Sequence, residues 1–193
     1  MLIAITGGIG VGKSTIIDEL KKLGANTIKT DEINKELLLQ PHYIEKINAE
    51  FPGVVEKGQI NKKKLKKLIF NDESMRLKLN SIAHPLILEK IIDENKKHDL
   101  LFVEIPLLYE SNSKDIFDQV WFVKSKYENR LDRIMKRDNI SSSLASKIIL
   151  SQEKESNYEN IADYVFDNDK DITYIQSSIK QLWEQLSSKN NQT

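Results

Sequence analysis

The segment Gly7-Gly8-Ile9-Gly10-Val11-Gly12-Lys13-Ser14 limits the possible folds of this chain more than any other stretch of it. The segment matches the pattern G-x-x-x-x-G-K-[ST] at every fixed position. A short apolar run precedes it at residues 2–5, and apolar residues at helical spacing follow it over residues 13–23. Glycines let the backbone turn several N–H groups toward one anion, and the N-terminus of a following helix adds to the same point. The sequence therefore predicts a strand, a phosphate-binding loop and a helix, in that order.

The rest of the chain continues the alternation of strands and helices. A second strand is expected at residues 26–30, and it completes a β-α-β unit. Short apolar runs predict further strands at residues 100–105, 120–123 and 164–166. Helical spacing is present at residues 126–137, 141–152 and 172–186. This order predicts the α/β class, with a doubly wound, five-stranded parallel sheet of the P-loop NTPase type and a ligand site at the carboxyl ends of its strands.

Residues 32–97 interrupt this alternation. Their pattern is mostly helical and carries no strand signal, so we expect a helical insertion between two strands of the sheet. The 193 residues fit one compact domain with an insertion or two better than two independent domains. We expect its core at residues 1–31, 98–124 and 161–193, the insertion at about 32–97 and a helical lid at about 125–160.

The composition excludes several classes of protein. Lysine plus arginine and aspartate plus glutamate both number 29, and a net charge of zero argues against a large nucleic-acid surface. The chain has no cysteine, so it forms no disulfide and no thiolate metal site. The apolar run at the N-terminus is too short for a signal peptide, and no run reaches the ~20 apolar residues that span a bilayer. We expect a cytoplasmic protein with no membrane contact and no obligate protein partner.

The loop predicts how a nucleotide would be held. Lys13 would reach the β- and γ-phosphates, and the Ser14 hydroxyl would be a ligand of Mg²⁺. A GTPase switch is disfavoured, because it needs an Asp-x-x-Gly element and this chain has neither that spacing nor any glycine after Gly58. The guanine-reading pattern Asn-Lys-x-Asp is absent as well. The loop therefore favours ATP and a phosphotransferase.

Two further features are candidates for kinase chemistry, and each has a structural alternative. Asp31 follows the second expected strand, where a carboxylate would accept a proton from an attacking hydroxyl or hold Mg²⁺ through water. It would equally serve as the N-cap of a helix that begins near residue 32. Arg130, Arg133 and Arg137 share one face of a helix in a chain with 25 lysines and only one other arginine. They would bind phosphate on a mobile lid, or they would form a solvated helix face.

The ordered set of motifs resembles the dephospho-CoA kinase family. The resemblance covers residues 2 to about 170, and its landmarks are residues 5–15, Asp31, residues 84–87, residues 106–110, Arg133, residues 137–138, Gln152, residues 162–165 and Asn168. It implies ATP-dependent phosphorylation of the ribose 3′-hydroxyl of dephospho-CoA, which gives CoA and ADP. It also implies a nucleotide-binding core, a helical CoA domain and a lid, with Mg²⁺ accompanying ATP.

The resemblance implies roles for particular residues. The catalytic residues would be Asp31 as the base, Lys13, and Arg137 as the lid arginine. The ATP-binding residues would be Gly8, Ile9, Gly10, Val11, Gly12, Lys13, Ser14, Thr15, Arg133, Arg137 and Asn168, with Asn168 bordering the adenine. The acceptor-binding residues would be Thr6, Asp31, Lys62, His84, Pro106, Leu107, Leu108, Tyr109 and Glu110.

The chain departs from the family pattern at three places. Lys29 replaces the first aspartate of Asp-x-Asp, Asn61-Lys62 replaces an Asp-Arg pair, and Asp169-Lys170 replaces a glycine that usually follows Asn168. None of these changes removes a core catalytic group. Two other functions stay open from the sequence alone: a kinase of nucleosides or nucleoside monophosphates, and an ATP-binding regulatory module without phosphoryl transfer.

Overall fold

The computed structural model describes residues 1–106, 108, 113–152, 159–160 and 162–190, with the backbone alone for residues 70, 71, 189 and 190. The chain divides into two compact units, one formed by Met1–Lys29 with Asn95–Thr193 and the other by Thr30–Glu94. We call them unit 1 and unit 2. No helix in the described ranges is long and apolar enough to cross a membrane.

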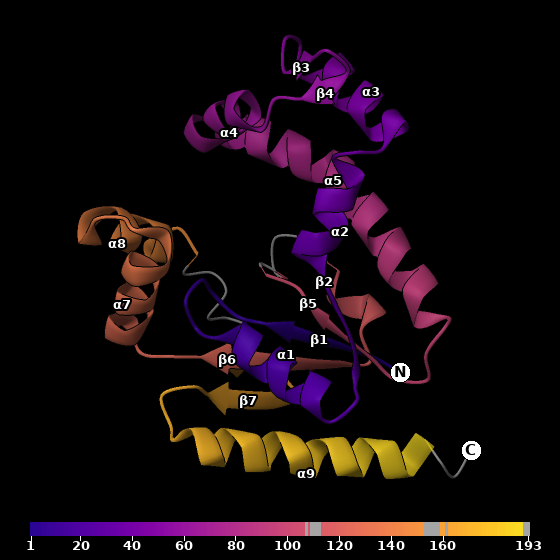
Figure 1. Cartoon of the computed structure of the whole chain (residues 1–193), viewed down its shortest axis with the longest axis vertical. Coiled ribbons are helices and arrows are strands. Elements are labelled where there is room, and N and C mark those ends of the chain that lie inside the picture. Colours follow the sequence, from indigo (N-terminus) through magenta and orange to yellow (C-terminus); the bar gives the residue numbers. More distant parts are fainter. Residues whose placement is uncertain (107, 109–112, 153–158, 161, 191–193) are drawn as a thin grey trace. The chain divides into compact units, whose positions relative to one another are not determined.

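Unit 1 is built on a five-stranded sheet whose order is β2-β5-β1-β6-β7 (Figure 1). All its neighbouring strands run parallel. Its strands are β1 (Leu2–Thr6), β2 (Asn26–Lys29), β5 (Leu101–Glu104), β6 (Gln119–Lys124) and β7 (Tyr164–Asp167). The central strand β1 is buried along its whole length, as a parallel strand covered on both faces should be. The predicted α/β class and five-stranded parallel sheet are confirmed.

Helices α1 (Lys13–Lys22) and α9 (Ile172–Asn190) lie side by side and share the main core of unit 1 (Figure 1). The apolar stripe of α1 packs with residues of α9, such as Ile175 and Ile179, around the buried Trp121 of β6. These residues form one hydrophobic cluster with Ile3 and Ile5 of β1. The cluster fixes β1, the strand that leads into the loop. The end of β1 is therefore held rigidly where the phosphate-binding loop starts.

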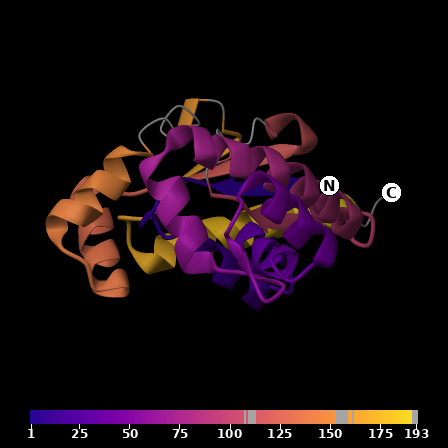
Figure 2. The same ribbon diagram turned by 90° about the horizontal axis from the view of Figure 1, so that it is seen from above.

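A second helical pair in unit 1 consists of α7 (Tyr127–Asp138) and α8 (Ser142–Leu150). The two helices lie together in both views, in orange, and bury a small cluster of Ile134, Ala145 and Ile149 (Figures 1 and 2). Ser141 caps α8 by accepting a hydrogen bond from the Leu144 amide. A 3₁₀ turn, η1 (Lys114–Ile116), precedes β6.

Unit 2 is mostly helical and has its own core. Its helices are α2 (Thr30–Leu37), α3 (Pro41–Glu50), α4 (Lys62–Asn71) and α5 (Glu73–Asn95), the last ending at the boundary of unit 1. Tyr43, Ile47, Phe51 and Leu65 are among the buried residues of this core. One expectation was wrong here, because unit 2 also contains a small antiparallel sheet.

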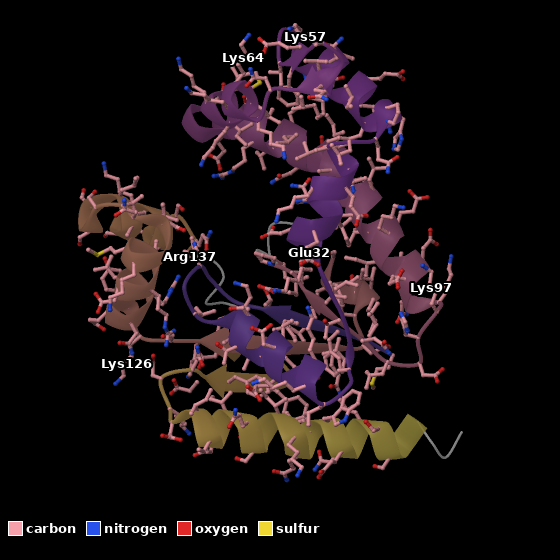
Figure 3. All side chains as sticks on the ribbon, in the orientation of Figure 1. Glu32, Lys57, Lys64, Lys97, Lys126 and Arg137 are labelled. Atoms are coloured by element: carbon pink, nitrogen blue, oxygen red, sulfur yellow. The ribbon has the colours of Figure 1, made fainter. Side chains whose placement is uncertain are left out.

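This sheet pairs β3 (Val55–Glu56) with β4 (Gln59–Ile60). Each strand has two residues, which is too short for alternating hydrophobicity to be visible in the sequence. The turn between them has positive φ at Lys57 (50°) and Gly58 (75°), the backbone of a tight two-residue hairpin. Lys64 of α4 reaches this hairpin and forms an ion pair with Glu56 (Figure 3).

Candidate active site

The phosphate-binding loop requires glycine because other chain segments touch its backbone. Gly12 precedes α1 as its N-cap with φ of 94°, and a Cβ there would lie 2.0 Å from Nδ2 of Asn168. A Cβ on Gly8 would lie 2.5 Å from Nη2 of Arg130. The loop is thus packed closely between the turn after β7 and helix α7, and side chains from both elements reach it.

Lys13, the second predicted catalytic residue, is buried at the start of α1. Its Nζ donates hydrogen bonds to the carbonyl oxygens of Gly7, at 2.7 Å, and Gly8, at 3.0 Å. Only 8% of the residue is exposed. Ser14 and Thr15 follow in the first turn of α1, with the Ser14 side chain exposed. The loop thus carries a fixed ammonium group and a hydroxyl at the same helix N-terminus, where anions are favoured.

The peptide of Ile9, at the tip of the loop, is held from both sides. Arg130 of α7 donates from Nε to the Ile9 carbonyl oxygen at 2.9 Å. The Ile9 amide donates to Oε1 of Gln152 at 2.7 Å. The Ile9 side chain packs against the α7–α8 cluster. The sequence indicated Arg130 only as one of three arginines on a helix face and Gln152 only as a landmark of the resemblance, and it predicted a contact with Ile9 for neither residue.

Arg133 and Asn168 both meet the loop, as expected, and in this structure both bind its carbonyl groups. Arg133 donates from Nη1 to the carbonyl oxygens of Gly10, at 3.1 Å, and Val11, at 3.3 Å. Its Nη2 donates to the carbonyl oxygen of Asn168 at 3.1 Å. The Asn168 side chain donates to the Val11 carbonyl oxygen at 2.8 Å. These bonds tie the loop to α7 and to the turn after β7, and they fix the loop conformation.

Arg137 differs from the other two arginines of its helix. It lies near the end of α7 and is exposed, and Figure 3 shows it on that helix with Lys126 at the helix start. Its guanidinium forms two hydrogen bonds of 2.8 Å with the carboxylate of Asp138. These bonds raise the pKa of Arg137 although partial burial opposes them. Because the pair is exposed to water, it holds the arginine only weakly.

Asp169 connects the turn after β7 to the start of α7. Its carboxylate accepts hydrogen bonds from the Ser125 hydroxyl at 2.6 Å, the Lys126 amide at 2.5 Å and the Asn129 side chain at 2.7 Å. Arg133 lies 4.0 Å from it. Burial alone would raise the pKa of Asp169, but these hydrogen bonds and the nearby guanidinium lower it. Asp169 thus caps α7 from another part of the chain, a role that no local sequence pattern indicates.

Replacing Asp169 with alanine is expected to lower the free energy of unfolding by about 0.5–2 kcal/mol, the range for a lost helix cap, because the exposed Lys126 and Asn129 donors can bond to water instead. A carboxylate whose pKa is lowered by folding stabilises above its unfolded pKa of roughly 3.9, and this contribution is lost as pH falls through the lower folded pKa. The difference between parent and variant in urea unfolding should therefore be full at pH 7 and smaller near pH 3. Asp132→Ala, which removes an exposed carboxylate from the same helix, is the control.

The acceptor-binding candidates of unit 1 lie at the carboxyl ends of its strands. Thr6 ends β1 and is fully buried, and Pro106 and Leu108 follow β5, with Leu108 buried. Leu107, Tyr109 and Glu110 lie outside the described residues. At the same sheet edge Lys29 ends β2 and Glu104 ends β5, and their charged groups are 3.7 Å apart. Lys29 replaces an aspartate of the family pattern, and its positive charge is partly neutralised by the carboxylate of Glu104.

The remaining candidates belong to unit 2. Asp31 is exposed in the first turn of α2, which starts at Thr30, so Asp31 is not the N-cap of that helix. Lys62 is exposed at the start of α4, where Asn61 is the N-cap and accepts a hydrogen bond from the Lys64 amide. His84 lies partly buried within α5. Among the described residues no three side chains of His, Cys, Asp or Glu gather into a metal site.

Comparisons with known proteins agree with this geometry. The family model of dephospho-CoA kinase matches residues 1–173. A dephospho-CoA kinase of Fusobacterium nucleatum is 34% identical over 192 residues, which cover 96% of this chain and 98% of that protein. One from Moorella thermoacetica is also 34% identical, over 194 residues that cover 96% and 92% of the two chains.

Solved structures show the same relationship. The dephospho-CoA kinase of Campylobacter jejuni superposes with a TM-score of 0.71 and 28% identity, over 98% of both chains. The Thermus thermophilus protein TT1252 superposes with a TM-score of 0.83 and 26% identity, over 96% of this chain and 97% of that one. A shikimate kinase of Bacteroides thetaiotaomicron, at 17% identity and a TM-score of 0.57, shares the fold alone. The chain therefore belongs to the dephospho-CoA kinase family and is a kinase, a transferase of coenzyme A biosynthesis.

Proposed function

We propose that the protein transfers the γ-phosphoryl group of ATP to the ribose 3′-hydroxyl of dephospho-CoA and so forms CoA and ADP. The observation that carries the proposal is the closely packed loop with Lys13 buried beneath it, in a chain of this family. The ATP phosphates would lie on the loop, where backbone amides, the N-terminus of α1 and the Lys13 ammonium meet. Residues 8–15 would surround them, and Asn168 would border the adenine.

Mg²⁺ fits the groups that the loop presents. Magnesium prefers oxygen ligands and is commonly held by one or two protein groups together with substrate phosphates and water. The exposed Ser14 hydroxyl at the start of α1 is such a group, and no larger protein cage is needed. When bound, the ion would neutralise charge on the β- and γ-phosphates. Ser14 would hold the ion, and Asp31 would help to hold it through water.

Asp31 would act as the general base. It stands two residues beyond the carboxyl end of β2, and β1, which leads into the loop, pairs with β5 next to β2 in the same parallel sheet. Ligands of such sheets bind at that edge. The Asp31 carboxylate would take the proton of the 3′-hydroxyl as its oxygen bonds to the γ-phosphorus. The bond from that phosphorus to the β–γ bridging oxygen breaks, and ADP leaves with its electron pair.

The other candidates would bind and enclose the substrates. Unit 2 would be the CoA domain, with Lys62 and His84 contacting the acceptor, and Thr6 and residues 106–110 would complete the acceptor site. Helices α7 and α8 would be the lid. Arg137 would leave its exposed pair with Asp138 and meet the transferred phosphoryl group, since such surface pairs contribute little. Arg133 would support the nucleotide site chiefly through its bonds to the loop carbonyls.

The acceptor is tested by measuring ADP formation with Mg²⁺, ATP and either dephospho-CoA or a series of nucleosides and nucleoside monophosphates. Among these acceptors we expect turnover only with dephospho-CoA. We also expect turnover to be lost when EDTA removes the metal. Thermal unfolding adds a binding test without catalysis, because a ligand at ~100 times its Kd adds about 2.7 kcal/mol of stability. Equal or greater turnover with a nucleoside monophosphate would overturn the assignment of dephospho-CoA as the acceptor. Binding of ATP without any phosphoryl transfer would identify a regulatory module instead.

A further inference from the structure

The three arginines of α7 use their donor groups differently. Arg133 donates to four oxygen atoms, those of Gly10, Val11, Ser125 and Asn168. Arg137 places its guanidinium against a carboxylate at the surface. Arg130 uses Nε for the Ile9 carbonyl, while its Nη2 is buried without a hydrogen-bond partner in the described part of the chain. Arg130 alone of the three therefore has a buried donor free beside the loop.

The charge of Arg130 is not balanced by the residues around it. Within the described ranges no carboxylate forms an ion pair with it, whereas Arg133 and Arg137 each have an acidic neighbour. Burial lowers the pKa of Arg130, and burial is the cause of that shift, with no opposing charge beside it. Arg130 is half-buried with its Nη2 group fully buried, and a partly desolvated cation without a counter-charge is destabilising. Desolvated charged side chains of this kind gather at functional sites, where an anionic ligand would supply the missing charge.

The position of Nη2 indicates which ligand that is. It lies against Gly8, where a Cβ would come within 2.5 Å, and so beside the first part of the phosphate-binding loop. The neighbouring Ile9 amide, which belongs to the same loop, already donates to Gln152 and is engaged. The loop therefore gives up one backbone donor at this point and gains a guanidinium donor next to it. The Ile9 peptide, which donates one hydrogen bond to Gln152 and accepts one from Arg130, holds that guanidinium in place.

We propose that Arg130 is a phosphate-binding residue of the nucleotide site and that its Nη2 group donates to an oxygen of the ATP phosphate chain. The inference rests on the proposed function only in taking ATP as the ligand of the loop, and it is independent of the acceptor. Arg130 then has two roles at once. Its Nε positions the Ile9 peptide, and its Nη2 binds the anion.

The proposal predicts a large effect on binding and a small one on stability. Arg130→Met keeps much of the length of the side chain and removes both the charge and the donors. We expect the Kd of ATP to rise by about 10- to 100-fold, which corresponds to the loss of a hydrogen bond to a charged group. The Tm of the unliganded protein should change little, because the loss of the Nε bond to the Ile9 carbonyl and the removal of a partly buried, unbalanced charge act in opposite directions. A residue that merely supports the fold would show the reverse, with a lower Tm and little change in affinity.

Isothermal titration and thermal unfolding of the full chain, without acceptor, provide both measurements. Tripolyphosphate is titrated beside ATP, because it carries the phosphate chain without the base, and its affinity should fall by a similar factor. Lys136→Met removes an exposed positive charge from the same helix and is the matched control, with the parent affinity expected. Arg130→Lys keeps the charge and should lie between parent and Arg130→Met, and it preserves the test if the methionine variant folds poorly.

Each outcome decides the matter. A weakened Kd for ATP and tripolyphosphate at a nearly unchanged Tm supports the contact with phosphate. The proposal is overturned if both Arg130 variants bind ATP and tripolyphosphate as tightly as the parent. It is also overturned if they lose no more affinity than Lys136→Met does. If the parent protein itself binds neither ATP nor tripolyphosphate, the proposed function fails first, and that result is distinct from an effect confined to Arg130.

Discussion

Asp31→Asn is expected to lower kcat by about 10²-fold or more and to leave the Kd of ATP close to that of the parent, because general-base catalysis contributes on this scale. Asparagine has nearly the same shape but accepts no proton at neutral pH. Asp31 is exposed in the first turn of α2, so the substitution disturbs no buried contact. Steady-state kinetics with dephospho-CoA, together with titration of ATP, separate the effect on chemistry from the effect on binding.

Glu32→Gln is the matched control for Asp31. Glu32 is the next residue, also exposed and also in the first turn of α2 (Figure 3). A carboxylate in the first turn interacts favourably with the helix dipole and stabilises the helix by about 0.3–1 kcal/mol. Both variants lose this interaction to the same extent. Equal and small losses in the two variants would return Asp31 to the role of a helix-terminus charge. A fall confined to Asp31→Asn would support the base.

Lys13→Met is the second variant for which a large effect is expected. It should lower kcat by about 10²- to 10³-fold, the scale for losing one fixed group that stabilises charge in the transition state. The Kd of ATP should rise as well, because the ammonium also attracts the bound phosphates. The variant loses the hydrogen bonds from Nζ to the Gly7 and Gly8 carbonyls, so the loop conformation has to be checked. Circular dichroism and unliganded Tm serve that purpose.

Lys21→Met provides the comparison for Lys13, since Lys21 is exposed in the last turn of the same helix. It removes one positive charge without touching the loop, and we expect parent-like kcat. Retained turnover in Lys13→Met with normal folding would show that the loop amides and α7 hold the transferred group without the ammonium. That result would contradict the role assigned to Lys13 and leave the loop as a binding element alone.

The fold could be predicted from the sequence because its signals are local. The apolar runs that form β1, β5 and β6 are short and bounded by turn residues, and the loop motif lies between a strand and a helix. Element boundaries differ from the prediction by a few residues at most, as for α9, which was expected to end at residue 186 and reaches Asn190. The hairpin of β3 and β4 was missed because two-residue strands carry no periodicity.

The contacts around the loop could not be predicted in the same way, because they join distant residues. Gln152 reaches the amide of Ile9 across 143 positions, and Asn168 reaches the Val11 carbonyl across 157. The sequence indicated that three arginines share a helix face, but it did not distinguish their partners. Asp169 was noticed only as a departure from the family pattern, and the cap that it gives to α7 requires the tertiary structure.

The strand order of the sheet has a consequence for how the protein is made. β1 is synthesised about a hundred positions before β5 and β6, yet it lies between these two strands in the sheet. Unit 2 is one continuous stretch, and the described residues of its main hydrophobic cluster all lie within Thr30–Glu94. We expect unit 2 to gain structure during translation. β1 and its loop stay unpaired until β5 and β6, which ends at residue 124, have been synthesised. That delay makes β1, an unpaired apolar strand, the segment for which chaperones would matter most.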